Sequence, residues 1–253
     1  MKVSILQFKP ALGEIANNFK LVDKLMKDEA IKSTDIVVLP ELWSTGFYPK
    51  PVKDFADKCG YRTCNFLSEL AIKNNVNIIG GTVIVEENCK FYNRCFTFNR
   101  QGKIIAVYDK IHLFSMSKEN NVFQSGYEIP VFEIEGIKAS VVVCYDIRFP
   151  ELIRKAALCD IDILFVPAAW PLKRLNHWQI LTKARAIENQ IFVVAANSMG
   201  YSSIIDPCGT ILSESTTEAK IITVDININI RTEIKGTMNT LADCNKFQIK
   251  KQY

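Results

Sequence analysis

Residues 138 to 157 read KASVVVCYDIRFPELIRKAA, which is an apolar run, a cysteine, a short turn and a helix start. The apolar and β-branched residues 139 to 143 predict a strand buried on both faces. Cys144 stands where that strand ends. Pro150 and Glu151 both suit a first helical turn, because the missing proline N–H is not needed there and a carboxylate complements the helix dipole. The stretch therefore predicts an elbow that holds a thiol at a rigid strand end.

A cysteine at such an elbow has two interpretations. A lone buried cysteine is usually a small hydrophobic residue. A thiolate is favoured only if a cation or backbone N–H dipoles lie near the sulfur. The choice therefore depends on which other reactive residues reach the same place.

Two other stretches place reactive residues at strand ends. Residues 35 to 43 read DIVVLPELW, an apolar strand followed by the carboxylate of Glu41. Lys110 follows the strand-like residues 103 to 107. A carboxylate, an amine and a thiol can then meet at one sheet edge, and such a set suits acyl transfer by a cysteine nucleophile.

This set, in this order, resembles the Glu–Lys–Cys triad of the nitrilase (carbon–nitrogen hydrolase) superfamily. The segments PELW (residues 40 to 43), DKIHLF (109 to 114) and CYDIRFPE (144 to 151) look like its three signatures, and the resemblance runs from residue 3 to about 226. AAWPLKR (168 to 174) and ARAIENQ (184 to 190) are similar to the amidase branch that includes ω-amidases acting on α-keto acid amides. The resemblance implies a small-molecule amidase that releases ammonia through a thioester, with no cofactor and no metal.

The chemistry of these groups gives each a distinct role. Cys144 attacks the carbonyl carbon, and Glu41 takes the thiol proton and later passes one to the departing ammonia. Lys110 balances the developing oxyanion, together with the backbone N–H of Tyr145. Glu119 matches a second glutamate that related amidases place near the lysine, where it positions the lysine or the substrate. The alternative for Glu119 is a solvated loop carboxylate.

Further residues are expected around the site, with different roles. Those expected to border the substrate are Phe47, Trp170, Pro171 and Arg174. Arg174 is placed to meet a substrate carboxylate, or else it is solvated on an exposed turn. Asp146 and Arg148 are expected to pair or hydrogen-bond near the elbow. His112 is expected to be satisfied in the core, and His177 to lie near the rim.

The chain also contains an internal repeat, because four segments recur in the same order. The pairs are residues 2–8 with 138–144, 35–43 with 162–170, 76–81 with 191–196, and 98–105 with 205–212. Two similar halves predict two sheets packed face to face with helices outside, an α/β fold arranged as a four-layer α-β-β-α sandwich with an internal pseudo-two-fold. No linker separates the halves, so we expect a single domain over residues 1–253, with the tail from about 231 unplaced.

The helices and one loop are predicted from shorter patterns. Apolar residues at helical spacing predict the helices, and the polar composition of residues 115 to 126 predicts a loop over the site. The predicted helices are residues 17 to 32, 66 to 73, 150 to 159 and 176 to 189. The last two are apolar on more than one side, which is wider than one core-facing stripe. We therefore expect a homodimer or a higher even oligomer through these helices, the alternative being that both lie deep in a monomer's core.

Composition and charge exclude several classes of function. The chain has 253 residues, 48% of them hydrophobic, and its 31 basic and 27 acidic residues leave a net charge of only +4. No basic patch suits a nucleic acid or a membrane surface, and no segment approaches the ~20 apolar residues of a membrane span. The N-terminal apolar run is too short for a signal peptide, so we expect a cytoplasmic protein whose eight cysteines are thiols.

Three alternatives to an amidase stay open. A nitrilase or an N-carbamoyl-amide hydrolase would share every residue of the triad. A catalytically silent member used as a binding subunit is disfavoured by the intact triad. A redox or metal-binding thiol protein is disfavoured because the cysteine spacings do not fit Cys-x-x-Cys.

Overall fold

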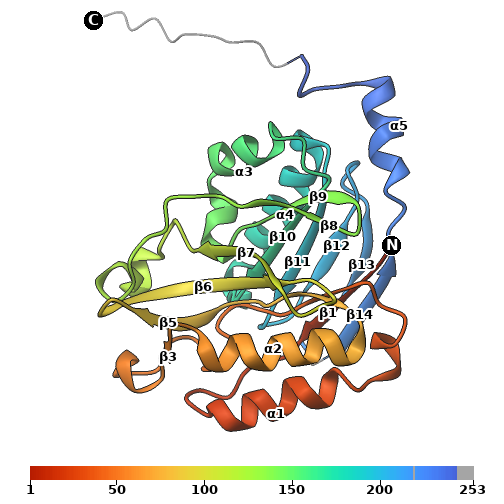
Figure 1. Ribbon diagram of the computed structural model, residues 1–253. Helices are drawn as coiled ribbons and strands as arrows, with labels where there is room; N and C mark the ends of the chain where they lie inside the picture. Colours follow the sequence, from red (N-terminus) through yellow and green to blue (C-terminus); the bar gives the residue numbers. More distant parts are fainter. Residues whose placement is uncertain (219, 244–253) are drawn as a thin grey trace, which may run out of the picture.

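The computed structural model describes residues 1–218 and 220–243, which form four layers (Figure 1). Two helices cover one side of a pair of stacked sheets, and two others cover the opposite side. The first pair is α1 (Ile15–Leu25) and α2 (Tyr61–Asn74), and the second is α3 (Pro150–Ala157) and α4 (Leu175–Asn189). The predicted α-β-β-α sandwich is therefore confirmed.

Strands from the first half of the chain form the first sheet and strands from the second half form the second sheet, except that β14, near the C-terminus, joins the first sheet. The first sheet has the order β14-β1-β2-β4-β6-β5-β3, with β7 also paired to β6. Its strands are β1 (Lys2–Gln7), β2 (Ile36–Val38), β3 (Asp57–Lys58), β4 (Asn77–Ile79), β5 (Val83–Glu87), β6 (Lys90–Phe98), β7 (Ile104–Asp109) and β14 (Lys220–Asp225). The second sheet has the order β13-β12-β11-β10-β9-β8, made of β8 (Val131–Ile134), β9 (Ile137–Val141), β10 (Ile163–Ala168), β11 (Phe192–Asn197), β12 (Ser203–Ile205) and β13 (Ile211–Glu214).

The strand orders show the predicted repeat in three dimensions. The path β14-β1-β2-β4-β6-β7 in the first sheet corresponds to β8-β9-β10-β11-β12-β13 in the second. The outermost pair of each path, β14 with β1 and β8 with β9, is antiparallel, and the next pair is parallel. Strands β3 and β5 belong to the first sheet alone, so the two halves are similar but not identical.

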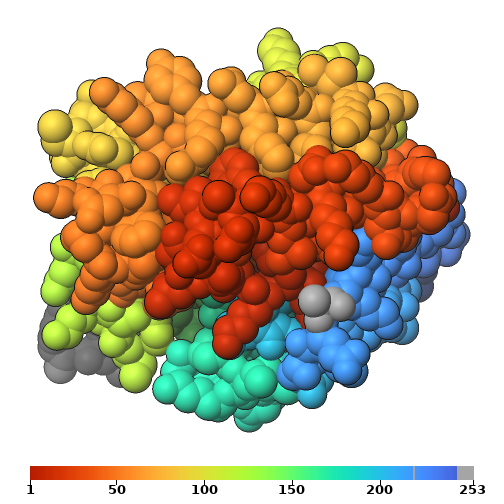
Figure 2. All heavy atoms as spheres, turned by 90° about the horizontal axis from the view of Figure 1, so that it is seen from below, coloured from red at the N-terminus to blue at the C-terminus, as the bar shows by residue number. Residues whose placement is uncertain are grey.

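Alternating residues of the first sheet face two different parts of the core, one between the sheets and one under the helices. On β1, Val3 and Ile5 pack between the sheets, whereas Leu6 and, just beyond the strand, Phe8 pack under α1 and α2. Burying each such side chain contributes ~1.5–3 kcal/mol. Figure 2 shows this helical side from below, where the red and orange atoms of the N-terminal part of the chain cover most of the face.

Several boundaries differ from those that the sequence predicts, and α2 begins at Tyr61, before the predicted start at residue 66. The helix expected over residues 17 to 32 ends at Leu25, because Asp28 starts a separate 3₁₀ turn, Glu29–Ile31, by accepting the Ala30 N–H at 2.9 Å. The unplaced tail begins with a helix, α5 (Asn229–Thr237), held by ion pairs from Arg231 to Asp160 and Asp162. The last ten residues of the tail, 244 to 253, lie outside the described residues.

The two sheets meet where β2 and β10 end. Glu41 follows β2, and its backbone N–H donates to the carbonyl oxygen of Ala168 at the end of β10, at 3.4 Å. Gly81 lies beside this junction with φ +58°, and a Cβ there would be 2.1 Å from the carbonyl oxygen of Pro40. Glycine is therefore needed for the chain between β4 and β5 to pass so close to the Glu41 segment.

Candidate active site

Cys144 lies on the predicted elbow. It begins a short 3₁₀ turn, Cys144–Arg148, that joins the β9 segment to α3 at Pro150. Its φ is +48°, a left-handed conformation that costs a residue with a Cβ about 1–3 kcal/mol. Asp146 stabilises the turn by accepting the Val143 N–H at 2.9 Å and the Tyr108 hydroxyl at 2.7 Å.

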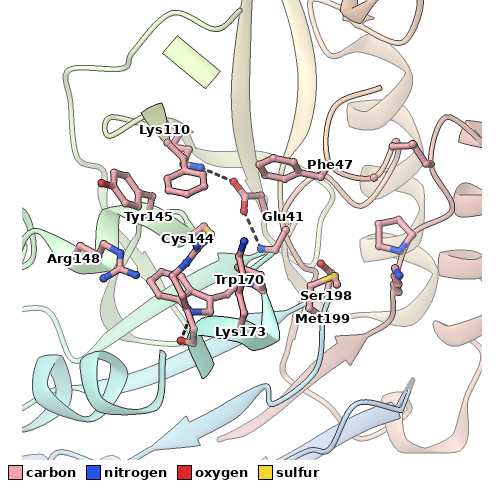
Figure 3. Close-up of a pocket in the computed structure, with 18 residues that line it drawn as sticks. Glu41, Phe47, Lys110, Cys144, Tyr145, Arg148, Trp170, Lys173, Ser198 and Met199 are labelled. Carbon is pink, nitrogen blue, oxygen red and sulfur yellow. Dashed lines mark hydrogen bonds and ion pairs between the residues drawn. The ribbon is translucent and has the colours of Figure 1, made fainter. Parts of the chain in front are cut away.

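Lys110 lies between the two predicted glutamates, and Figure 3 shows its contact with Glu41. Its Nζ is 2.8 Å from Oε1 of Glu41, and 3.1 and 3.0 Å from Oε1 and Oε2 of Glu119. All three side chains are almost wholly buried, at 1%, 0% and 0% exposure. Glu119 is therefore not a solvated loop carboxylate. The segment that carries it forms two 3₁₀ turns, Ser115–Ser117 and Glu119–Asn121, rather than a loose polar loop.

Backbone N–H groups and one side-chain amide provide the remaining hydrogen bonds to the two glutamates. Oε2 of Glu41 accepts the Ala169 N–H at 2.9 Å, and Oε2 of Glu119 accepts the Phe114 N–H at 2.6 Å. Asn93 on β6 donates its Nδ2 to Oε1 of Glu41 at 2.9 Å and to Oε1 of Glu119 at 3.3 Å. Sequence reasoning missed Asn93, which is one polar residue in a strand of mixed character.

Burial and mutual attraction set the charge of this cluster. Burial alone would lower the pKa of Lys110, but the carboxylates of Glu41 and Glu119 outweigh it and raise that pKa above its ordinary value. Burial raises the pKa of Glu119, while Lys110 opposes the change. The lysine is therefore a permanent cation at neutral pH, fixed by buried carboxylates.

Cys144 rests as a thiol. Burial, and then the neighbouring Glu41 carboxylate, raise its pKa well above the ordinary value, although Lys110 and the Ala169 N–H act in the opposite direction. The nearby cation is therefore not sufficient to give a resting thiolate. An attack by this sulfur needs a base that takes its proton, and Glu41 is the carboxylate that lines the same cavity and raises the pKa of the thiol.

The thiol faces a cavity of about 610 Å³. The predicted residues Phe47, Trp170, Pro171 and Arg174 all line it, as does Tyr145 (Figure 3 labels Phe47, Trp170 and Tyr145). Arg148 and Lys173 line it too, and lining residues that the sequence did not indicate are Lys9, Pro10, Leu12, Gly46, Ser198 and Met199. The cavity therefore has the three reactive groups on its wall and basic side chains around them.

Asp146 and Arg148 do not pair with each other, although both form hydrogen bonds near the elbow, as the alternative form of the prediction has it. Within the 3₁₀ turn the two side chains reach different partners, Asp146 binding Tyr108 and the Arg148 guanidinium lying 4.5 Å from the ring centre of Trp170. Burial and then the charge of Arg174 lower the pKa of Arg148. The two guanidiniums are thus close enough to repel each other across the cavity.

Neither histidine lies on the cavity wall. His112 stacks on Phe149 with ring centres 3.5 Å apart, and its Nδ1 is 2.9 Å from Oδ1 of Asp146. His177 is exposed, with its Nδ1 3.3 Å from Nη2 of Arg148. Both histidines therefore support residues of the elbow.

The described residues contain no group of three or more His, Cys, Asp or Glu side chains that could hold a metal ion. The cysteines at positions 59, 64, 89, 95, 144, 159 and 208 are free thiols. Along residues 1–218 and 220–243, every helix is too short or too polar to cross a membrane.

Comparisons with known proteins agree with this geometry. The sequence pattern of the family described as carbon-nitrogen hydrolase matches residues 2–235. The chain is 38% identical over 253 residues to the 2-oxoglutaramate amidase of Bacillus subtilis (strain 168), covering 96% of this chain and 97% of that protein. It is 30% identical over 254 residues to the omega-amidase NIT2 of Xenopus tropicalis, covering 92% and 91%.

A solved structure gives the same result for the fold. XC1258 from Xanthomonas campestris, a CN-hydrolase superfamily protein with an arsenic adduct in its active site, matches with a TM-score of 0.91 and 26% identity over 99% of both chains. Since the family pattern spans nearly the whole chain and the related amidases align over more than nine-tenths of it, the protein belongs to the carbon–nitrogen hydrolase family and is a hydrolase of C–N bonds in small-molecule amides.

Proposed function

We propose that the enzyme is an ω-amidase-like hydrolase of small monoamides that carry a carboxylate, such as monoamides of dicarboxylic and α-keto acids. One observation carries this proposal: the Cys144 cluster opens into a cavity lined by the cations Arg148, Lys173 and Arg174. Glu41 is the only carboxylate among the described residues that line this cavity. Two related proteins are named 2-oxoglutaramate amidase and omega-amidase, and these names indicate the same class of substrate.

Acylation begins with proton transfer to Glu41. The Cys144 sulfur attacks the amide carbon as its proton moves to the Glu41 carboxylate, and a C–S bond forms. The carbonyl electrons move to the oxygen. When they return, the C–N bond breaks and the proton on Glu41 passes to the leaving nitrogen, which departs as ammonia.

The oxyanion is stabilised by charge and by the elbow backbone. Lys110 keeps its positive charge throughout, because its pKa is raised. The N–H of Tyr145 belongs to the first turn after β9, where N–H groups have no partner within the turn. One such donor contributes ~3–4 kcal/mol to the transition state.

Deacylation reverses the proton movements. Glu41 takes a proton from water, the hydroxyl oxygen attacks the thioester carbon, and the C–S bond breaks. The proton returns to the sulfur, so the product is the carboxylic acid and the enzyme is regenerated.

Glu119 acts through Lys110 and has no proton-transfer role. Its two oxygens accept two contacts from Lys110, one from Asn93 and one from the Phe114 N–H, which fills the four lone-pair sites of a carboxylate. It therefore fixes the ammonium group in place.

The basic residues of the cavity select the substrate. Arg174 lies 5.1 Å from the ring centre of Phe114, and Arg148 lies over Trp170, so both guanidiniums are supported by aromatic faces. A substrate carboxylate between them would relieve their mutual repulsion. A neutral amide would gain nothing there.

Ammonia release from a matched panel tests the function. The panel contains 2-oxoglutaramate, succinamate, a neutral amide of similar length, the corresponding nitrile and an N-carbamoyl amino acid. We expect the two acidic monoamides to show the highest kcat/KM, and Arg174→Gln to lower it for these alone, chiefly through KM. A preference for the nitrile or the carbamoyl compound would instead favour one of the other carbon–nitrogen hydrolases, and ammonia release from none of them would favour a silent binding subunit.

We also propose a cytoplasmic homodimer in which each chain is one catalytic domain. The core between the sheets takes side chains from both halves, which supports one domain. Leu158, Ile180 and Ile187 on the α3–α4 side are 58%, 63% and 51% exposed, and an isologous contact would cover them. Light scattering at micromolar concentration tests this: a mass near the 28.7 kDa of one chain, with full activity, would refute the dimer.

A further inference from the structure

Asn93 contacts all three charged members of the active-site cluster. It lies on β6, fully buried, and does not line the cavity. Its Nδ2 is shared between Glu41 and Glu119, and its backbone carbonyl oxygen accepts the Lys110 N–H at 3.0 Å. A residue in this position can affect the reaction only through the groups it holds.

The orientation of the Asn93 amide is determined by its neighbours. Its Oδ1 is buried and has no hydrogen-bond partner in the described structure. Turning the amide over would place that oxygen against two carboxylate oxygens. The nitrogen must therefore face the glutamates, even though the carbonyl oxygen is left unsatisfied.

The contacts of Glu41 differ between its two oxygens. Oε1 accepts from Lys110 at 2.8 Å and from Asn93 at 2.9 Å, which fills both of its lone-pair sites. Oε2 accepts only the Ala169 N–H, at 2.9 Å, so one of its two lone-pair sites is left unfilled. The oxygen of Glu41 that can still take a proton is therefore Oε2.

We propose that Asn93 is a positioning residue that saturates Oε1 of Glu41, ties it to Glu119, and so makes Oε2 the oxygen that accepts the Cys144 proton. The inference rests on the proposed role of Glu41 as the base. Without Asn93, Glu41 can rotate or accept the proton on the wrong oxygen. Proton transfer then becomes slow, while substrate binding is unaffected.

Two substitutions test this, and the chain offers a matched control. Asn93→Ala removes the donor. Asn93→Asp keeps the shape but places a third carboxylate beside Glu41 and Glu119. The control is Asn189→Ala, because Asn189 is also fully buried with an unpartnered Oδ1, and it binds Arg185 away from the cavity.

Steady-state kinetics and the alkylation of Cys144 by iodoacetamide are both measured against pH. For Asn93→Ala we expect kcat to fall by ~10²-fold, the usual size of a general-base contribution, with KM changed less than about threefold. For Asn93→Asp we expect the acid limbs of both profiles to move to higher pH by about one pH unit or more. The reason is that the added negative charge makes the cluster bind a proton more readily. Asn189→Ala should lower the Tm and leave both profiles unchanged.

The outcomes separate this proposal from the proposed function. The role of Asn93 would be overturned if the pH profiles of Asn93→Asp are unshifted. It would also be overturned if folded Asn93→Ala keeps a kcat within threefold of the wild-type value. If Asn93→Ala does not fold, the isosteric Asn93→Asp decides alone. Loss of activity in Glu41→Gln together with wild-type behaviour of both Asn93 variants would refute the role of Asn93 only. Full activity in Glu41→Gln would refute the role of Glu41 as the base. The alkylation profile is measured without an amide substrate, so it does not depend on the proposed substrate class.

Discussion

Removing the buried cation should destabilise the enzyme strongly and in a pH-dependent way. Lys110→Met fills a similar volume but leaves the Glu41 and Glu119 carboxylates without a counter-charge in a site that is 0% exposed. Breaking a buried pair of this kind costs ~3–5 kcal/mol. For a chain of this size, 1 kcal/mol corresponds to a Tm change of about 2–4 °C. We therefore expect the Tm at pH 7.5 to fall by roughly 6–20 °C.

The pH dependence follows from Glu119. Burial already raises its pKa, and Lys110 is the largest influence that lowers it, so the substitution raises this pKa further. A group whose folded pKa lies above its unfolded value of ~4.3 stabilises the protein fully below that value, and the stabilisation is lost as the pH rises through the folded pKa. The deficit of Lys110→Met should therefore be small near pH 5 and grow towards pH 8.

Urea unfolding at pH 5 and pH 7.5 measures the effect, with Lys27→Met as the matched control. Lys27 pairs with Asp23 on the surface and is 58% exposed, and an exposed pair contributes only ~0–1 kcal/mol. If the two substitutions cost the same, or if the Lys110→Met deficit does not shrink at pH 5, the electrostatic description of the cluster is wrong.

Three further predictions concern activity and packing. Glu41→Gln should lower kcat at least ~10²-fold in an ammonia-release assay, because the amide cannot accept the thiol proton, and a loss of less than tenfold would contradict this. The profile of kcat/KM against pH should have an acid limb from the cluster and no alkaline limb near the ~8.5 of an ordinary thiol, because the pKa values of Cys144 and Lys110 are both raised. Gly81→Ala should lower both Tm and activity, since its Cβ would meet the carbonyl oxygen of Pro40 at 2.1 Å; a wild-type Tm would show that the chain can relax there.

The sequence predicts the fold well because its signals are local and repeated. Each recurring segment is an apolar strand with a recognisable end, and the strand orders of the two sheets follow the repeat. The apolar runs also predict that Glu41 and Cys144 lie at strand ends, because each run stops at or just before one of these residues in the sequence. The resemblance to a known family added Glu119, which the polar composition around it would have placed in solvent.

What the sequence does not predict depends on long-range burial. Asn93 is polar in a strand, which favours an exposed position, and only the packing of β6 against the Glu41 and Glu119 segments buries it. Asp146 and Arg148 are two residues apart, yet the 3₁₀ turn gives them different partners. The resting thiol of Cys144 follows from its depth of burial, which no local pattern reports.

The central claim, that Cys144 is the nucleophile, is tested most directly by ammonia release from 2-oxoglutaramate. Wild-type enzyme, Cys144→Ala and Cys95→Ala are compared at equal concentration, Cys95 being a second buried cysteine whose pKa burial raises to about 12. Cys144→Ala should fold and release no ammonia above the rate without enzyme, whereas Cys95→Ala should keep its activity despite a lower Tm. Turnover by Cys144→Ala above about a hundredth of the wild-type rate would contradict the claim.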